Sequence, residues 1–259
     1  MSDAIAPPLQ RPSRLQLNWL LPALFKPRAT LALIAAEGRP IWLTPMLVLS
    51  LTALLVVMVA GPIKAAAVQS GQALPPDFQY FTPEQQAQFL QAQAATTGPV
   101  FVYVFSALLA LLRLWFGWLV MGGLLHLVLT LFGGRGSAGA ALNLVAWASL
   151  PFAIRDLVRA AVMQNGHALI ASPGLAGFAP TGTGWAIALA SEALARVDIY
   201  GLWYLALLII GARAMGGLKL GSAVTAVVIA AVIALLLGIL PGVVASQFSG
   251  LTVVRPFFF

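Results

Sequence analysis

The chain has 259 residues, of which 61% are hydrophobic and only 8% are charged, and its formal net charge is +7 at pH 7. Roughly a quarter of the residues in a soluble domain are charged, so this composition is too apolar for a globular surface in water and indicates an integral membrane protein. The absence of cysteine excludes disulfides, thiolate catalysis and cysteine-ligated metals. The basic residues are spread singly along the chain, which favours a membrane-orientation signal over nucleic-acid binding.

Residues 1–41 are predicted to form a basic N-terminal segment that is not a signal peptide. Residues 27–36 (PRATLALIAA) favour a short helix, because Pro27 suits its first turn and Gly38 follows its end. Trp19 and Phe25, close to basic side chains, are typical of a segment that lies in the headgroup region. A disordered basic tail is the alternative.

The first membrane span is predicted at about residues 42–63, which contain no charge and suit a bilayer core of ~30 Å. An outer loop, residues 64–99, follows. Within it, Thr82-Pro83-Glu84 has the pattern of an N-cap, a first-turn proline and a first-turn acid, so a helix is expected from Glu84 to about Ala95.

The second hydrophobic stretch, residues 100–132, is longer than one simple crossing and has no turn signal in its middle. Arg113 would be costly at the bilayer centre, whereas at an interface its side chain can reach the headgroups. We therefore place the crossing at about residues 114–132, with Arg113 at its outer boundary and residues 100–112 either beyond the bilayer or packed on other helices. A strongly tilted helix is the alternative.

Three further spans are predicted at about residues 138–154, 199–214 and 222–246, with an outer loop at 155–198 and a short outer tail at 247–259. Together, residues 42–246 form an all-α, five-transmembrane-helix bundle. Its orientation follows from the distribution of arginine and lysine, eight of which lie on one side: Arg11, Arg14, Lys26, Arg28, Arg39, Arg135, Arg213 and Lys219. Because basic residues favour the cytoplasmic side, the N-terminus is expected in the cytoplasm and the C-terminus outside.

Polar residues inside spans are candidate functional residues. His126 is predicted to donate a hydrogen bond between helices, with a proton relay or a ligand role as the alternative. Asn143 and Trp147 lie one turn apart on one helix face, where an asparagine usually stabilises helix packing. Asp156 and Asp198, with neighbouring charges, are interpreted as solvated ion pairs at the outer interface, with an outward-facing ion or ligand site as the alternative.

No catalytic pattern is present. Ser137 lies in a glycine-rich loop like that of a serine intramembrane protease, but no histidine follows on a later helix, since His167 is in the outer loop. The sequence contains no P-loop, no HExxH and no carboxylate pair inside a span. We therefore expect no enzymatic activity, no cofactor and no metal site.

The order of several motifs resembles the Yip (Ypt/Rab-interacting protein) domain family, in its bacterial branch, over about residues 20–245. The motifs are Leu24–Thr30 (LFKPRAT), Arg39–Trp42 (RPIW), Ala148–Pro151 (ASLP) and Asp198–Trp203 (DIYGLW), followed by Gly211. The resemblance implies a five-helix bundle with a cytoplasmic N-terminus. We do not expect the recruitment of small GTPases to carry over, because residues 1–41 are not expected to form the N-terminal cytoplasmic domain of the eukaryotic members. Some bacterial members accompany ABC-type exporters.

These observations favour a non-enzymatic scaffold or accessory subunit that lies in the bilayer, in a bacterial cytoplasmic membrane, and binds another integral membrane protein, possibly an ABC-type exporter. Small residues on helix faces support helix contacts with a partner: Gly117, Gly122, Gly123, Gly238 and Gly242. A small transporter or channel would need facing charges or an inverted repeat within the spans. A bilayer-shaping protein that acts through its interfacial segments is the second alternative.

Asp198 and Trp203 carry most of the resemblance, and a structural role is predicted for both. Asp198 precedes the fourth span and can cap its N-terminus. Trp203 lies five residues further on, too deep for the interface, so its ring is expected to pack on the third span near Trp147 or Pro151.

Overall fold

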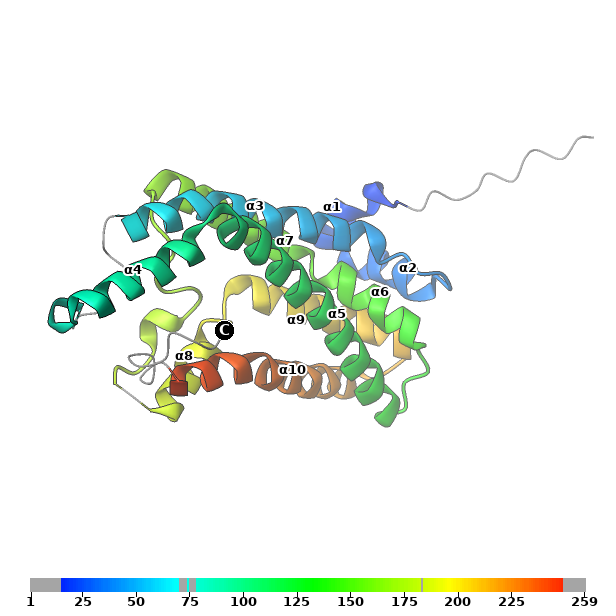
Figure 1. Ribbon diagram of the computed structural model, residues 1–259. Coiled ribbons are helices and arrows are strands. Elements are labelled where there is room, and N and C mark those ends of the chain that lie inside the picture. Colours follow the sequence, from blue (N-terminus) through cyan, green and yellow to red (C-terminus); the bar gives the residue numbers. More distant parts are fainter. Residues whose placement is uncertain (1–14, 70–73, 75–77, 183, 249–259) are drawn as a thin grey trace, which may run out of the picture.

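The computed structural model describes residues 15–69, 74, 78–182 and 184–248, and all the regular elements found there are helices (Figure 1). The α-helices are α1 (Leu20–Phe25), α2 (Pro27–Ala36), α3 (Leu43–Gln69), α4 (Pro83–Thr97), α5 (Ser106–Leu131), α6 (Ala138–Ala148), α7 (Leu150–Gly166), α8 (Trp185–Leu194), α9 (Ile199–Gly216) and α10 (Leu220–Phe248). Short helical turns are η1 (Leu17–Trp19), η2 (Phe78–Tyr80) and η4 (Ala176–Phe178), and the π-helical η3 (Val100–Phe105) leads directly into α5.

In the part of the chain that the structure describes, five helical segments are long and apolar enough to cross a membrane: Leu43–Ala67, Val100–Leu131, Ala138–Gly166, Ile199–Gly216 and Leu220–Gly242. The predicted all-α fold with five candidate spans is therefore confirmed. Two of the segments are more than ten residues longer than the spans predicted for them. The second includes residues 100–112 in one continuous helical segment, and the third continues as α7 through Arg155 and Arg159 to Gly166.

Helix α6 lies at the centre of the bundle, and nearly all of its side chains are buried. It contacts α5 on one side and α9 and α2 on another. Gly211 of α9 allows a close approach, because a Cβ atom at this position would collide with the side chain of Leu144. The N-terminal helices α1 and α2 also pack against α6, and Leu31 and Ile34 of α2 are fully buried.

The third candidate span is two helices rather than one. Helix α6 ends at Ala148, Ser149 has the turn-like backbone angles φ −75° and ψ −6°, and α7 starts at Leu150. Pro151, in the first turn of α7, has no N–H to continue the hydrogen bonds of α6, so the interruption follows directly from the sequence. Pro151 is buried here, and the interruption redirects α7 along α3.

Helices α3 and α5 run antiparallel and contact each other at several levels. The ring of Tyr103 fills the space beside Gly61, and the Trp115 indole N–H donates a hydrogen bond of 3.3 Å to the Ser50 hydroxyl. One turn further along α5, the Trp118 ring lies 4.9 Å from that of Trp42. These contacts determine which residue of α3 lies at the same height along the bundle as each residue of α5.

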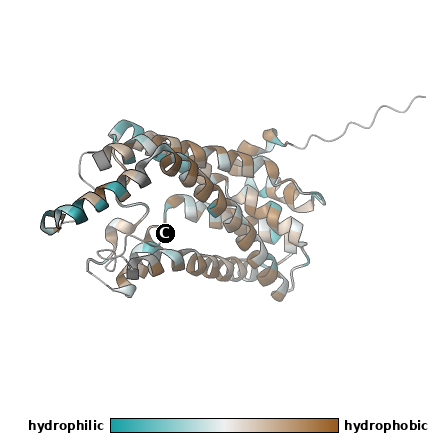
Figure 2. Ribbon diagram, in the orientation of Figure 1, coloured by the Kyte–Doolittle hydropathy of each residue, from teal (hydrophilic) through white to brown (hydrophobic). Residues whose placement is uncertain are grey.

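Helix α4 is the hydrophilic helix of the molecule and projects away from the apolar bundle (Figure 2). It begins as predicted, with Thr82 as N-cap and Pro83 in the first turn. The Gln85 N–H donates to the Thr82 hydroxyl, and the Thr82 N–H donates to the Gln85 side chain, so the cap is reciprocal. Residues 1–14 and 249–259, which include most of the predicted outer tail, lie outside the described residues.

Candidate functional site

Asn143 and Trp147 on α6 bind the backbone that links α2 to α3. The Asn143 carboxamide accepts a hydrogen bond from the Ile41 N–H at 2.9 Å and donates one to the Arg39 carbonyl at 2.9 Å. One turn further, the Trp147 indole N–H donates to the Ile41 carbonyl at 3.1 Å. Both side chains are buried, so these bonds satisfy polar groups that water cannot reach. Asn143 therefore stabilises helix packing, as the sequence predicted.

Trp203 packs against the hydrophobic core, which includes Trp147, and it also contacts the N-terminal helices. Its ring contact in the described chain is with Phe25 of α1, at 6.4 Å between centroids, and Trp203 is only partly buried. The ring partner of Trp147 is Trp19, at 6.0 Å. The N-terminal helices, which the sequence placed in the headgroup region, thus contact this side of α9. The next residue, Tyr204, faces the third span, and its ring lies 5.0 Å from that of Phe152.

His126 is partly exposed on α5, and its ring forms no hydrogen bond with any described residue. Only its backbone carbonyl accepts a bond, from the Thr130 hydroxyl at 2.8 Å. The interhelical hydrogen bond predicted for His126 is thus not found in the described part of the chain. The sequence of an apolar helix does not show whether a neighbouring helix places a hydrogen-bond acceptor beside its single histidine.

Asp198 caps α9 and also joins α9 to α7. Its Oδ1 atom accepts a hydrogen bond of 2.7 Å from the Gly201 N–H, which is the predicted N-cap. Its Oδ2 atom lies 3.6 Å from Arg155 and 3.9 Å from Arg159. The two arginines are one turn apart on α7, so one carboxylate reaches both. The Asp198 side chain is only 13% exposed, so the pairs are more enclosed than the predicted solvated pairs.

Asp156 completes this group, which we call the α7–α9 ionic cluster (Arg155, Asp156, Arg159 and Asp198). Asp156 lies 3.6 Å from the Arg155 Nε atom, and the Arg155 guanidinium lies 4.5 Å above the Phe152 ring. The Arg155 Nε atom is buried without a hydrogen-bond partner. A separate ion pair, Arg196 with Glu192 at 2.8 Å, lies just before Asp198 in the chain.

Arg196 connects the loop before α9 to α10. Besides its pair with Glu192, it donates a hydrogen bond of 2.6 Å to the Gly238 carbonyl. Gly242, one turn along α10, lies so close to Glu192 that a Cβ atom there would come within 2.8 Å of the carboxyl carbon. Gly238 and Gly242, two of the glycines that the sequence assigned to a partner surface, therefore pack against α8 and the Glu192–Arg196 ion pair.

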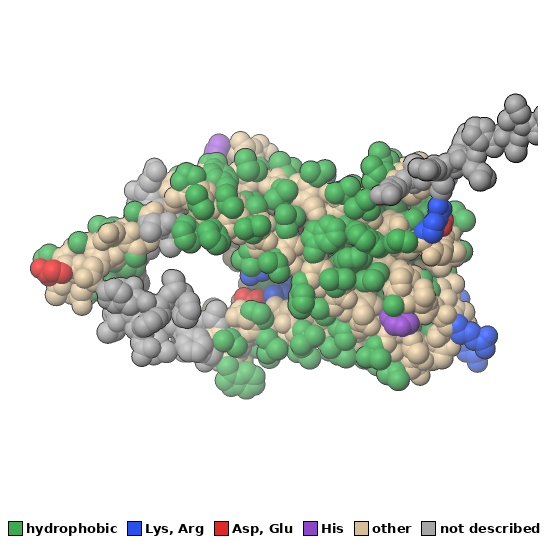
Figure 3. All heavy atoms as spheres, turned by 45° about the vertical axis from the view of Figure 1, so that its right-hand side comes forward, with side chains coloured by type: hydrophobic (Ala, Val, Ile, Leu, Met, Phe, Trp, Pro, Cys, Tyr) green, Lys and Arg blue, Asp and Glu red, His purple; other side chains and the backbone are tan. Residues whose placement is uncertain are grey.

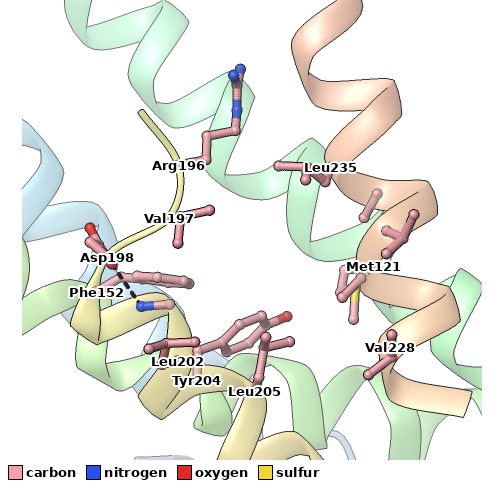
Figure 4. A pocket seen from close by; sticks show the side chains of 14 residues that line it. Met121, Phe152, Arg196, Val197, Asp198, Leu202, Tyr204, Leu205, Val228 and Leu235 are labelled. Carbon is pink, nitrogen blue, oxygen red and sulfur yellow. Dashed lines mark hydrogen bonds between the residues drawn. The ribbon is translucent and has the colours of Figure 1, made fainter. Parts of the chain in front are cut away.

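A cavity of about 380 Å³ lies between α5, α7, α9 and α10 and borders the ionic cluster (Figure 4). Its wall is apolar, with Met121, Leu205 and Val228 at one end, whereas Arg196 and Asp198 line the other. Tyr204 lies across its floor. In Figure 3, basic and acidic side chains lie together inside a recess of an otherwise largely hydrophobic face. No sequence signal indicated this cavity, because its apolar lining residues resemble any others in a span.

Arg113 is exposed and forms no ion pair or hydrogen bond with any described residue. The α3–α5 contacts place it about level with Thr52, which is ten residues from Trp42 and eleven from Ile63. If α3 crosses the bilayer at residues 42–63, Arg113 is at mid-depth. The two predictions from sequence, this first span and an outer-boundary position for Arg113, are therefore incompatible in the folded chain.

Large apolar side chains form a stripe beside Arg113 on the outward face of η3 and α5. The stripe repeats every three or four residues, and each side chain leaves about half or more of its surface exposed: Phe105, Leu109, Leu112, Phe116 and Leu119. We call this surface the α5 face. Gly117 and Gly123 are exposed on the same helix with open space around them, whereas Gly122 packs inward against Leu142. The α5 face thus has no partner within the described chain.

Substitution of Asp198 should separate its two roles. Asp198→Asn keeps an oxygen for the Gly201 N–H but loses the attraction to the arginines, so we expect a loss of about 1 kcal/mol in unfolding free energy for a partly exposed pair. Asp198→Leu also removes the cap and should cost about 2–3 kcal/mol. Denaturant unfolding of the detergent-solubilised protein measures both. Equal losses would show that the cap contributes nothing.

The chemistry available at these sites is ionic and apolar. Among the described residues, no group of three or more histidine, aspartate or glutamate side chains could hold a metal ion. In the comparison with protein families, the Yip1 domain matches over residues 23–240, which include both the ionic cluster and the α5 face. No curated protein and no solved structure matches the chain.

Proposed function

The chain belongs to the Yip1 domain family and is a multipass membrane protein, and from this premise we propose that it is a non-enzymatic scaffold or accessory subunit. It binds another integral membrane protein through the α5 face. The observation that supports this proposal is Arg113, a cation that has no ionic partner among the described residues and lies level with the middle of the first candidate span, beside an exposed apolar stripe.

The position of Arg113 is costly in lipid alone. An arginine at the centre of a transmembrane helix costs ~2.5–3.5 kcal/mol on insertion scales. The half-thickness of the apolar core is ~15 Å, further than an arginine side chain reaches, so the guanidinium cannot lie fully among the headgroups. A partner helix with an aspartate or glutamate at the same depth would neutralise the charge and offset this cost.

The stripe beside Arg113 has the geometry of a helix-packing surface. Side chains spaced alternately by four and three residues form the seam that a second helix fills in left-handed packing. Phe105, Leu109, Leu112 and Phe116 follow this spacing directly. Arg113 lies next to Leu112 and one turn from Leu109 and Phe116, so a partner helix on this seam would reach it.

The proposal includes the orientation and the location. The N-terminal segment, the 133–137 hairpin and the loop around Lys219 carry most of the basic residues, so they face the cytoplasm and the α7–α9 ionic cluster lies toward the outside. A bacterial cytoplasmic membrane is the proposed location, and an ABC-type exporter is a suitable partner because its spans provide a large helical surface within the same bilayer.

A photo-crosslinking amino acid at Phe116 should test the proposal in intact cells. We expect a crosslink to an integral membrane protein, and copurification of the same protein in mild detergent. Arg113→Leu should lower its recovery at least fivefold, because the partner's carboxylate would then be left unpaired in the membrane.

Matched positions serve as controls. A crosslinker at Ile233, on the exposed side of α10, should not capture the same protein, and Arg213→Leu, at an exposed arginine of α9, should leave its recovery unchanged. If no integral membrane protein is crosslinked or copurified, the scaffold proposal is wrong. If a partner is recovered equally well with Arg113→Leu, the α5 face is not its binding surface.

A further inference from the structure

The cavity between α9 and α10 is open toward the bilayer. Three of its lining side chains, Leu202, Val228 and Val232, leave between 46% and 61% of their surface exposed. They lie on the faces of α9 and α10 that point away from the bundle, and both helices are candidate spans. A molecule dissolved in the membrane can therefore enter the cavity sideways without crossing water.

The cavity extends along about two turns of α9 and of α10, which is less than the depth of one leaflet. Seven residues separate Asp198 from Leu205 on α9, and seven separate Val228 from Leu235 on α10, or about 10 Å along each axis. Each leaflet contributes ~15 Å to the apolar core. The cavity thus runs from a polar rim toward the middle of the bilayer, with apolar walls along its depth.

Arginine donors without hydrogen-bond partners lie next to the polar rim. Arg155 and Arg159 contact Asp198 at 3.6 and 3.9 Å, and Arg155 contacts Asp156 at 3.6 Å, all longer than a hydrogen bond. No hydrogen bond joins either guanidinium to a described residue. Since each guanidinium has five N–H donors in a planar fork, the cluster can still bind an oxyanion bidentately.

We propose that this cavity binds a phospholipid, with one acyl chain between α9 and α10 and the phosphate at Arg155 and Arg159. The two carboxylates of the cluster balance the two arginines, so recognition depends on hydrogen bonds to phosphate oxygens rather than on long-range attraction. Asp198 lines the cavity and connects it to both guanidiniums, at 3.6 and 3.9 Å. Arg196 is already bound to Glu192 and Gly238 and borders the entrance instead.

The site is separate from the α5 face and does not depend on the scaffold role. Its wall comes mainly from α9 and α10, and Met121 is the residue that α5 contributes. Arg113, by contrast, is two turns before Met121 on α5 and lies outside the lining. A lipid in this cavity would fill the space between α9 and α10 and join them to α7, so it should stabilise the bundle.

Three probes distinguish a phospholipid from its parts. Delipidated protein in detergent is titrated with dioleoyl phosphatidylglycerol, with dioleoylglycerol, which has the same chains without phosphate, and with inorganic phosphate. The midpoint of thermal unfolding and native mass spectrometry report binding. We expect dioleoyl phosphatidylglycerol to raise the unfolding midpoint and to remain bound, whereas dioleoylglycerol and inorganic phosphate each have at most a small effect.

Two variants test the two ends of the site. The double variant Arg155→Gln, Arg159→Gln removes the phosphate donors, and Ala231→Phe fills the cavity without changing its charge. Each should raise the phosphatidylglycerol concentration needed for half-maximal stabilisation at least tenfold. Arg213→Gln, at an arginine far along α9, and Ile229→Phe, on α10 outside the lining, should leave that concentration unchanged.

Equal stabilisation by dioleoylglycerol or by inorganic phosphate would overturn the proposal, because the acyl chains alone or the phosphate alone would then account for the binding. Unchanged phosphatidylglycerol binding in both variants would also overturn it. If the double arginine variant does not fold, Ala231→Phe with its Ile229→Phe control decides the matter alone.

Discussion

Trp147→Ala is expected to lower the free energy of unfolding by about 4–6 kcal/mol, the largest effect of any single substitution considered for this protein. The Trp147 side chain is fully buried at the centre of the bundle, and truncation of a buried tryptophan to alanine costs about 3–5 kcal/mol through lost contacts and the remaining cavity. The substitution also leaves the Ile41 carbonyl without its donor, which adds about 1 kcal/mol or more. Denaturant unfolding in detergent measures the total.

Trp203→Ala is the matched control for Trp147. Its ring is only partly buried and contacts Phe25 of the short helix α1, so we expect a loss of about 1–2 kcal/mol, at the lower end for an aromatic contact. Trp147→Phe should fall between the two, because it keeps an aromatic ring but loses the indole N–H. Equal losses for both alanine variants would contradict the central position of Trp147.

Asn143→Leu is expected to cost about 2–4 kcal/mol although leucine has a similar volume. The substitution leaves the Ile41 N–H and the Arg39 carbonyl without partners in a buried site, at about 1–3 kcal/mol for each unsatisfied group in soluble proteins. Hydrogen bonds between membrane helices are on average weaker, which keeps the expected total below the sum. We also expect faster hydrogen exchange in residues 27–41, because this segment loses its attachment to α6.

His126→Leu provides the comparison for Asn143. Both residues are single polar side chains inside candidate spans, but the His126 ring has no hydrogen-bond partner in the described chain. His126→Leu should therefore leave the unfolding free energy unchanged or slightly raised, and exchange in residues 27–41 unaltered. Exchange in α10 serves as an internal reference in both variants. Should Asn143→Leu leave residues 27–41 as protected as before, the two hydrogen bonds do not hold this segment.

Local sequence signals predicted local structure well. The N-cap at Thr82 and the cap of α9 by Asp198 were predicted, and each depends on a few neighbouring residues and on the backbone groups they satisfy. The interruption between α6 and α7 at Pro151 has an equally local cause but was not predicted. The boundaries of α2 were also predicted correctly, from Pro27 at its start to Gly38 beyond its end. Such features need no knowledge of which helices are neighbours.

The neighbours of each helix could not be read from the sequence. Every span is apolar around most of its circumference, so hydrophobic periodicity does not show which face is inside when lipid is the solvent. The contact of the Trp203 ring with Phe25 was accordingly not predicted. The same holds for Arg113: charge arguments place a lone arginine at an interface, and only the register of α5 against α3 shows that it is level with Thr52, near the middle of the first candidate span.

Composition and the lengths of apolar segments alone determined that this is an all-α membrane protein with five candidate spans, because the bilayer requires helices of fixed length whatever their arrangement. Only the tertiary structure decided which polar side chains meet. It brought Asn143 to the Arg39–Ile41 backbone and Asp198 to two arginines of α7, and it left Arg113 on the surface with no ionic partner among the described residues. Those pairings depend on the packing of residues more than 100 or about 40 positions apart, which no local pattern encodes.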